Sequence, residues 1–354
     1  MKNILVTGGA GYIGSHTIVE LLQAGYEVVS VDNYANSEPS VYKGIEQICG
    51  RKPMIVEGDC TDPIALRRCF EDDGQIDAVI HFAASKAVKE SVEQPLHYYR
   101  NNVGSLLTLL EAMREAGCSS VVFSSSCTVY GEAQASPVTE ESPILSATSP
   151  YGNTKRICEE ILCDTVAATE RSTDATYALR AISLRYFNPI GAHPSALIGE
   201  LPRGVPQNLV PFMTQTAAGF RSQLQVFGKD YNTPDGSCIR DYIYVVDLAK
   251  AHVAAVARLL QSGAPVLQGA EPLPYEVFNL GTGTGRTVLE LISEFEQVTG
   301  KPLPYKVVGR RAGDIEKIWA EPSKAVRALQ WEADTPIREV LASAWAWQQR
   351  IASS

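Results

Sequence analysis

The sequence predicts an α/β fold built on a doubly wound parallel sheet, followed by a smaller C-terminal α/β lobe. Two observations predict it. Short β-rich runs alternate with helical patterns through the first half of the chain, which is typical of βαβ units. These runs are almost continuously apolar, as expected for strands covered on both faces. We therefore expect a first lobe over residues 1–187, with returns near 239–257 and 276–281, and a second lobe over residues 188–354.

The expected elements follow in chain order. Strands are expected at Asn3–Thr7, Glu27–Val31, Met54–Glu57, Ala78–Phe82 and Val121–Ser124, with helices between them such as Ser15–Ala24 and Gly104–Ala116. After Phe187, five prolines fall within the 24 residues 188–211, which predicts an irregular passage into the second lobe.

Composition narrows the classes of function. The net charge of -9 and the absence of a basic run argue against a nucleic-acid partner. The sequence shows no signal-peptide pattern and no apolar run long enough to cross a bilayer, so we expect no membrane role and a cytoplasmic protein. Eight scattered cysteines without a C-x-x-C pair indicate reduced thiols, and with five dispersed histidines they indicate no metal site.

The strongest motif is the glycine series Gly8-x-x-Gly11-x-x-Gly14, placed between the first strand and the first helix. Gly8 allows a tight turn, Gly11 lets a pyrophosphate approach the backbone, and Gly14 lets helix and strand pack closely. The phosphates would meet the positive end of the helix dipole. This pattern predicts a Rossmann-type dinucleotide site.

Two acids end the next strands. Asp32 can hydrogen-bond the adenosine ribose and would repel a 2′-phosphate, which favours NAD over NADP. Asp59 fits an ordinary turn and a contact with the adenine edge equally well. A second glycine-rich stretch at 279–290 lacks the wider spacing and a following acid. There Thr287 and Glu290 predict a capping box, so we interpret the stretch as a structural turn.

The candidate catalytic residues lie at a strand end and on the helix that follows it. SSSCTVYG, residues 124–131, follows an apolar strand, and Ser149-Pro150 predicts a helix start. On that helix Tyr151 and Lys155 share one face. A cation about 6 Å from a phenol contributes about 3 kcal/mol at an effective dielectric near 20, or about two pKa units. Lys155 and an oxidised nicotinamide ring would together bring the phenol to within about a unit of neutrality, and neither would suffice alone.

Together these motifs resemble the extended short-chain dehydrogenase/reductase family, and within it the UDP-glucose 4-epimerase branch. The matching segments are TGGAGYIGSH, FSSSCTVYG, SPYGNTK, LRYFNPIGAHPS, RDYIYVVDLA, FNLGTGTG and RRAGD, which span most of the chain. The resemblance implies an isomerase of galactose metabolism that interconverts UDP-galactose and UDP-glucose. The reaction would be a reversible hydride transfer at sugar C4 through a 4-keto intermediate, with NAD kept tightly bound.

The resemblance also implies residue roles. Tyr151 would take the proton of the 4-hydroxyl, Ser126 would bridge the proton path with Thr128 beside it, and Lys155 would hold the nicotinamide ribose. The implied cofactor contacts are Gly8, Gly11, Tyr12, Ile13, Gly14, Asp32, Asn33, Asn36, Ser37, Asp59, Cys60, Phe82, Ala83, Ala84, Lys86, Asn101, Ser124, Tyr151, Lys155, Tyr186 and Phe187. The implied UDP-sugar contacts are Lys86, Ser126, Thr128, Tyr151, Phe187, Asn188, Asn208, Leu209, Arg240, Tyr242, Arg311 and Asp314.

Three alternatives stay open at this point. Ile318 stands where relatives carry a bulky aromatic or a small residue, so epimerisation of UDP-N-acetylglucosamine is a second candidate activity. A nucleotide-sugar 4,6-dehydratase would need an acid just before Val-Tyr-Gly, where this chain has Cys127-Thr128. An NAD-binding regulator would not need the catalytic set intact. The resemblance further implies a homodimer that pairs through helices around 104–116 and 155–168.

Overall fold

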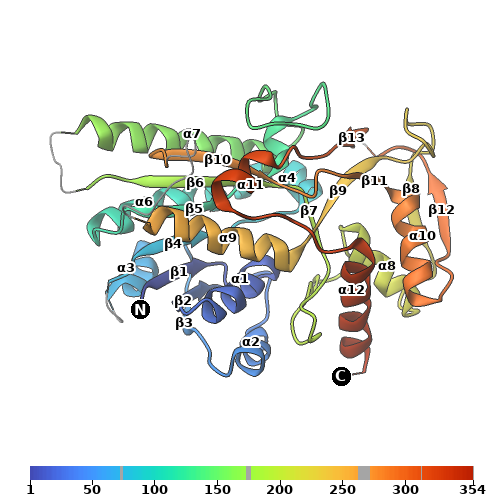
Figure 1. Ribbon diagram of the computed structural model, residues 1–354, viewed down its shortest axis with the longest axis horizontal. Coiled ribbons are helices and arrows are strands. Elements are labelled where there is room, and N and C mark those ends of the chain that lie inside the picture. The colour runs from blue at the N-terminus through green and yellow to red at the C-terminus, as the bar shows by residue number, and fades with distance from the viewer. Residues whose placement is uncertain (72–74, 173–176, 262–271, 312, 354) are drawn as a thin grey trace.

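The computed structural model describes residues 1–71, 75–172, 177–261, 272–311 and 313–353. Within these ranges seven strands form one parallel sheet, here the large sheet, in the order β10-β6-β5-β4-β1-β2-β3 (Figure 1). Its strands are β1 (Asn3–Thr7), β2 (Glu27–Asp32), β3 (Met54–Glu57), β4 (Ala78–His81), β5 (Ser120–Ser124), β6 (Arg180–Tyr186) and β10 (Tyr275–Leu280). The strand order reverses between β1 and β4, where doubly wound folds bind their ligands. The fold class predicted from the sequence is confirmed.

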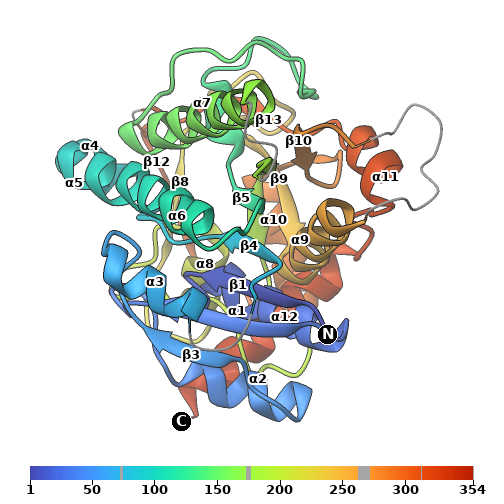
Figure 2. The same ribbon diagram turned by 90° about the vertical axis from the view of Figure 1, so that its left-hand side faces the viewer.

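Helices cover both faces of the large sheet (Figure 2). One face packs against α3 (Pro63–Glu71), α6 (Gly104–Glu115) and α7 (Pro150–Arg171), and the other against α1 (Tyr12–Gln23), α2 (Val41–Cys49), α9 (Val245–Leu260) and α11 (Ser323–Leu329). Successive strand residues such as Val121 and Val122 belong to opposite cores, and both are fully buried. This two-sided burial explains the continuous apolar runs in the sequence.

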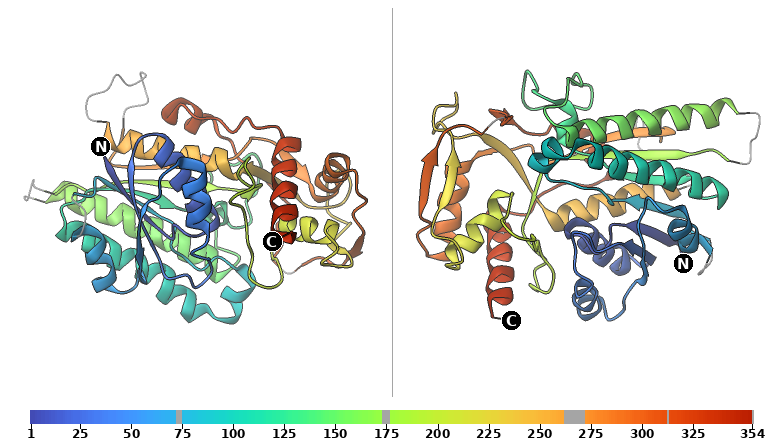
Figure 3. Two further views of the ribbon diagram at one scale, coloured as in Figure 1. Left: turned by 90° about the horizontal axis from the view of Figure 1, so that it is seen from below. Right: turned by 180° about the vertical axis from the view of Figure 1, so that it is seen from behind.

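The second lobe carries smaller sheets. β7 (Asn188–Ile190), β11 (Gly285–Thr287) and β13 (Lys317–Ile318) all pair with β9 (Ile239–Tyr244), and we call this set the small sheet. A separate pair is formed by β8 (Leu224–Phe227) and β12 (Tyr305–Val308). Both views of Figure 3 place these strands at the end of the molecule away from the N-terminus, beside α8 (Leu209–Ala217), α10 (Val288–Thr299) and α12 (Ile337–Ala352). In the segment 239–257, β9 lies in the small sheet, whereas α9 packs against the large one.

Short elements complete the chain. They are α4 (Val88–Glu93), α5 (Pro95–Tyr98), a π-helical turn at Tyr99–Val103 and a 3₁₀ turn at Cys127–Tyr130. No helix in the described part of the chain is both long enough and apolar enough to cross a bilayer.

Observed element ends differ from the expected ones by up to three residues. Helix α1 begins at Tyr12 instead of Ser15, because Gly11 already occupies the N-cap position. The capping box predicted for 279–290 is confirmed, since Thr287 and Glu290 bond each other's backbone at the start of α10. The predicted N-cap Ser149, with Pro150 after it, is confirmed at the start of α7.

Candidate active site

The turn between β1 and α1 has no room for a side chain at Gly8 or Gly14. Gly8 has a φ of +69°, which favours glycine, and a Cβ there would lie 2.9 Å from the Ala83 backbone nitrogen. A Cβ on Gly14 would lie 2.3 Å from the Gly8 carbonyl oxygen, so helix and strand are packed in contact. Gly11 caps the helix without a side chain, and the first turn of the fully described α1 holds no acidic residue. The turn therefore presents backbone N–H groups and the positive helix end to an anion.

Asp32 connects this turn to the loop that follows β2. Its carboxylate accepts hydrogen bonds from Ala10 N at 3.0 Å, Tyr34 N at 2.9 Å and the Ser37 hydroxyl at 2.8 Å. The side chain is buried and tied into the protein on both oxygens, so it fixes the loop in which Asn33, Asn36 and Ser37 were predicted to meet adenosine.

Asp59 closes β3 as a turn acid. It accepts hydrogen bonds from the Thr61 hydroxyl, the Thr61 backbone N–H and the Asn33 amide. Burial alone would raise the pKa of Asp59, but these hydrogen bonds outweigh it and lower the pKa. This geometry supports the turn interpretation, while a contact with adenine stays a prediction.

Three predicted cofactor contacts follow β4. Phe82, Ala83 and Ala84 are half-buried there, and Asn102, which the sequence analysis did not single out, fixes the next residue, Ser85. Its amide accepts from Ser85 N at 2.8 Å and donates to the Ser85 carbonyl at 3.0 Å. The predicted Asn101 also contacts Ser85, at 3.2 Å.

Glu200, also absent from the predicted set, joins two predicted residues from opposite lobes. It accepts from Asn208 at 2.8 Å and pairs with Lys86 at 3.4 Å. Nearby Arg203 donates to the backbone carbonyls of Ala35 and Ser37. The segment that contains Glu200 and Arg203 therefore touches both the cofactor loops and the start of α8, where Leu209 lies.

The catalytic candidates meet where β5 ends against α7. Lys155, on the first turns of α7, donates from Nζ to the Ser124 carbonyl at 2.6 Å. The Ser124 hydroxyl shares a 2.6 Å hydrogen bond with the Tyr186 hydroxyl. Ser126 accepts from the Thr128 hydroxyl at 3.0 Å and from its backbone N–H at 3.2 Å. The serine-rich end of β5 and Lys155 of α7, which were predicted as parts of one site, therefore lie in contact.

Burial dominates the protonation of this group. Burial raises the pKa of Tyr151, and the Tyr186 phenol adds to the increase, while the Ser126 hydroxyl opposes it. Burial also lowers the pKa of Lys155 to about 8. The expectation that Lys155 and an oxidised nicotinamide ring together make the phenol acidic stays a prediction.

The predicted sugar-nucleotide contacts gather on the small sheet. Arg240 and Tyr242 lie on β9, where Arg240 pairs in register with Ile318 of β13 and Tyr242 with Asn188 of β7. Ile318 is 2% exposed and packs in one apolar cluster with Phe187. Ile318 thus lies beside two predicted UDP-sugar contacts, Phe187 and Arg240.

Asp314 holds the two arginines that were predicted to contact the UDP-sugar. It accepts from Arg240 Nη2 at 3.2 Å and from Arg311 Nη2 at 2.9 Å. The Arg240 side chain is 15% exposed and that of Arg311 is 53% exposed. The two guanidinium groups therefore already converge on one anion, a carboxylate of the chain itself.

The remaining predicted residues lie around these groups. Tyr12 and Ile13 start α1, and the Tyr12 hydroxyl donates to the Gly191 carbonyl at 2.6 Å. Cys60 is buried behind β3, and Asn36 is exposed. Glu159, which the sequence analysis did not single out, lies one helical turn after Lys155 and is also buried. Its signal in the sequence is the four-residue spacing from Lys155.

Comparison with known proteins identifies the scaffold. The model of the NAD dependent epimerase/dehydratase family matches residues 4–281. The chain belongs to this family. A UDP-glucose 4-epimerase from Bacillus subtilis (strain 168) is 49% identical over 345 residues, which cover 98% of this chain and 96% of that protein.

Solved structures of epimerase/dehydratase family members agree closely in fold. UDP-glucose-4-epimerase from Stenotrophomonas maltophila, with bound NAD and formylated UDP-arabinopyranose, has a TM-score of 0.92 at 44% identity, covering 100% of this chain and 99% of that chain. The Bifidobacterium longum UDP-glucose 4-epimerase, in complex with NAD+ and UDP, has a TM-score of 0.90 at 45% identity, covering 99% and 98%. As a family member the chain is NAD-dependent, and the turn with glycine at positions 8, 11 and 14 fits the pyrophosphate of that cofactor.

Proposed function

We propose that this chain interconverts UDP-galactose and UDP-glucose by reversible oxidation and reduction at C4 of the sugar. The observation that carries the proposal is the group formed by Tyr151, Lys155 and Ser126 at the end of β5, next to a turn built for a dinucleotide. The identity of 49% to a UDP-glucose 4-epimerase over almost the whole chain supports the same activity.

The chain's own residues supply the proton chemistry. When bound, NAD accepts the C4 hydride and returns it to the opposite face of the sugar. Tyr151 takes the 4-hydroxyl proton, with Ser126 in the hydrogen-bonded path and Thr128 orienting the Ser126 hydroxyl. Lys155 supplies positive charge at the strand end, which opposes the effect of burial on the Tyr151 phenol.

The two arginines would bind the UDP diphosphate. In the chain alone Asp314 is their shared partner, so the diphosphate would take over guanidinium donors that are already oriented. Such pre-orientation lowers the entropic cost of binding. Anchoring at the diphosphate leaves the sugar free to turn between its two hydride-accepting faces.

The other activities are not favoured. The relatives reported above are named UDP-glucose 4-epimerases, and Ile318 fills the wall beside Phe187 without leaving a small residue there. The described turn 126–131 holds no carboxylate for a 4,6-dehydratase.

The test is an epimerase assay without added cofactor. Purified protein would be incubated with UDP-galactose and followed for UDP-glucose, beside the Tyr151→Phe variant. We expect turnover by the natural chain and a loss of at least ~100-fold in the variant. A 4-keto-6-deoxy product, or equal rates in both proteins, would contradict the proposal.

The proposal extends to the oligomeric state, the cellular location and the division of binding between two parts of the chain. We infer a homodimer through α6 and α7, supported by Leu107 on α6, which is 45% exposed, and by exposed Val92 and Leu96 close by in the chain. All eight cysteines lie in described ranges and are free thiols, which supports a cytoplasmic location. Residues 1–187 would bind NAD and residues 188–354 the UDP-sugar. Sedimentation that shows only monomer at micromolar concentration would contradict the dimer.

A further inference from the structure

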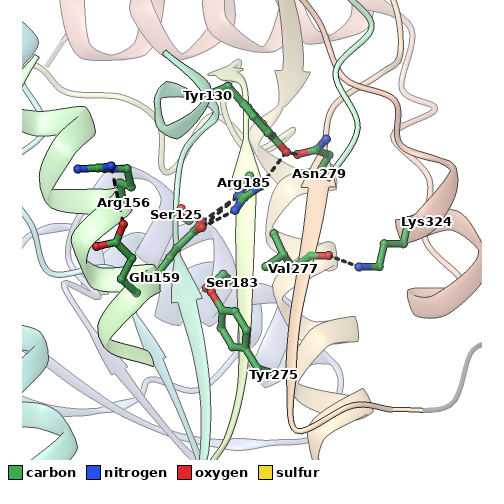
Figure 4. A network of polar contacts seen from close by, with 11 residues as sticks. Ser125, Tyr130, Arg156, Glu159, Ser183, Arg185, Tyr275, Val277, Asn279 and Lys324 are labelled. Atoms are coloured by element: carbon green, nitrogen blue, oxygen red, sulfur yellow. Dashed lines mark hydrogen bonds and ion pairs between the residues drawn. The ribbon is translucent and has the colours of Figure 1, made fainter. Parts of the chain in front are cut away.

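A buried ion pair lies directly behind the catalytic strand end (Figure 4). Glu159 of α7 and Arg185 of β6 form a two-pronged contact, with Arg185 Nη2 at 2.5 Å from Oε2 and Nε at 2.9 Å from Oε1. Both side chains are almost fully buried, with exposures of 6% and 4%. A buried pair of this kind is costly to desolvate and does not by itself indicate a gain in stability. Its position therefore calls for another explanation.

Each partner of the pair holds one part of the catalytic turn. The Ser125 hydroxyl donates to Glu159 Oε1 at 2.5 Å. On the other side, Arg185 Nη1 donates to the Tyr130 hydroxyl at 3.1 Å, and its guanidinium stacks over the Tyr130 ring. Tyr130 in turn donates to Asn279 of β10 at 2.6 Å. Residues 125 and 130 bracket the turn that contains Ser126 and Thr128, so the ion pair clamps this turn at both ends.

The Ser125 and Ser126 hydroxyls have different partners. The Ser125 hydroxyl donates to Glu159 of α7, whereas the Ser126 hydroxyl accepts from Thr128. The same helix reaches the preceding residue through Lys155 and the Ser124 carbonyl. Two contacts one helical turn apart thus fix two successive residues of the strand end.

We propose that Glu159 and Arg185 are positioning residues for the epimerase reaction, which set the orientation of Ser126 and the position of Lys155 by clamping the turn at residues 125–130. The inference rests on the proposed function for its kinetic consequences. Both residues act through the groups they hold, Ser125 and Tyr130, and neither is assigned a contact with the sugar or the dinucleotide.

Charge supports the same assignment. Lys155 is faced by His81 of β4 and by Cys158 and Glu159 of its own helix, with Tyr151 one turn earlier on that helix. Burial lowers the pKa of His81 to about 3 and raises that of Cys158 to about 12, so both are neutral near pH 7. Arg185 remains protonated, because Glu159 outweighs its burial and keeps its pKa high. The Glu159 carboxylate is thus the anion among these groups that favours the charged form of Lys155.

The first experiment removes one hydroxyl and leaves the ion pair in place. For Ser125→Ala we expect kcat for UDP-galactose to fall by about 5- to 20-fold, with KM changed less than twofold. The matched control is Ser183→Ala, which removes a buried hydroxyl of β6 that bonds Tyr275 at 3.0 Å, outside the catalytic turn. Its kcat should stay within twofold of the natural chain. Equal kcat values for the two variants would overturn the inference.

The second experiment changes the charge. In Glu159→Gln we expect the alkaline limb of the kcat profile to move to lower pH by at least half a unit, because Lys155 loses the anion that favours its protonation. The matched control is Glu276→Gln, in a second buried pair, where Arg258 binds Glu276 at 2.6 and 2.8 Å. That variant should lose thermal stability to a similar extent without a shift in the profile. An unshifted profile in a folded Glu159→Gln protein, or the same shift in Glu276→Gln, would contradict the inference.

A structural readout separates this inference from the proposed function. Crystal structures of the natural chain and of Ser125→Ala should differ in the Ser126–Thr128 contact and in the distance from Lys155 Nζ to the Ser124 carbonyl. An unchanged turn in Ser125→Ala would overturn the positioning role, whatever the kinetics. If the natural chain showed no epimerase turnover, the proposed function would fail, while this comparison would still decide the role of the clamp. The comparison of the natural chain with Ser125→Ala also tests the positioning role if Glu159→Gln does not fold.

Discussion

Lys155 donates its ammonium hydrogen bond to a backbone carbonyl, that of Ser124, at 2.6 Å. The charge at the strand end is therefore held by an acceptor that no substitution at position 124 removes. Burial lowers the Lys155 pKa from 10.5 to about 8, so the folded chain holds this proton less tightly than the unfolded chain does. Between those two pH values stability rises with pH, and below about pH 8 the full cost of roughly 3 kcal/mol is present.

The first prediction concerns the loss of stability caused by burying the charged Lys155 side chain. Lys155→Met should reduce epimerase turnover by at least ~100-fold, because the proton chemistry loses its cation. The melting temperature at pH 7 should be unchanged or a few degrees higher, because the buried charge is gone. Calorimetry beside the activity assay checks both parts. A variant that loses stability and activity together would show that the charge supports the fold instead of opposing it.

A second prediction concerns the glycine turn. Gly14→Ala places a Cβ 2.3 Å from the Gly8 carbonyl oxygen, so the backbone must shift. We expect a loss of about 1–3 kcal/mol in the free energy of unfolding and loss of copurifying NAD. Gly104→Ala is the matched control, since nothing lies within 4 Å of a Cβ there and it begins a helix. Urea unfolding should show that variant to be equal or more stable by about 0.5–1 kcal/mol.

Arg240 and Arg311 should differ in how much they contribute to the binding of UDP-galactose. Arg240 is 15% exposed and Arg311 is 53% exposed, so solvent screens the second more strongly. Arg240→Ala should raise KM for UDP-galactose by about 10- to 100-fold, the scale of losing a charge-assisted hydrogen bond. Arg311→Ala should raise it less, with kcat little changed in both. The reverse order would place the diphosphate elsewhere on the small sheet.

Acid should destabilise the fold through three buried histidines. Burial lowers the pKa of His16 and of His81 to about 3, and that of His252 to about 4. The unfolded chain titrates near ~6.5, so it binds more protons below that pH and stability falls as pH falls. Between pH 6.5 and 5 the loss should come to about 5 kcal/mol for the three groups together. Urea midpoints across this range check it, with His81→Gln expected to flatten the slope and exposed His97→Gln to leave it unchanged.

Sequence reasoning reached those parts of the site that depend on local geometry. Gly8 and Gly14 mark a turn where a side chain has no room, and Ser149 marks a helix start. Both features depend only on residues a few positions apart in the sequence. The apolar runs predicted five strands of the large sheet and the return near 276–281, whereas β6 was not among the expected strands. These features require no knowledge of which strands are neighbours.

Contacts across elements could not be predicted in the same way. The pair Glu159–Arg185 joins residues 26 apart, and it exists because β6 lies next to β5 beneath α7. The bond from Lys155 goes to a backbone oxygen, which leaves no mark in the sequence. The Tyr151 pKa in this chain depends chiefly on burial, which a pairwise estimate of charge from the sequence leaves out.

The bridge formed by Glu200 and Arg203 has a consequence for how the protein would work in a cell. Arg203 grips the loop at Ala35 and Ser37, while Glu200 holds Lys86 on one side and Asn208 on the other. A dinucleotide bound beneath the segment that contains Glu200 and Arg203 could dissociate only after several of these contacts had broken. We therefore expect NAD to stay bound through many catalytic cycles. The epimerase rate would then depend on the concentration of sugar nucleotide and not on the NAD/NADH ratio of the cell.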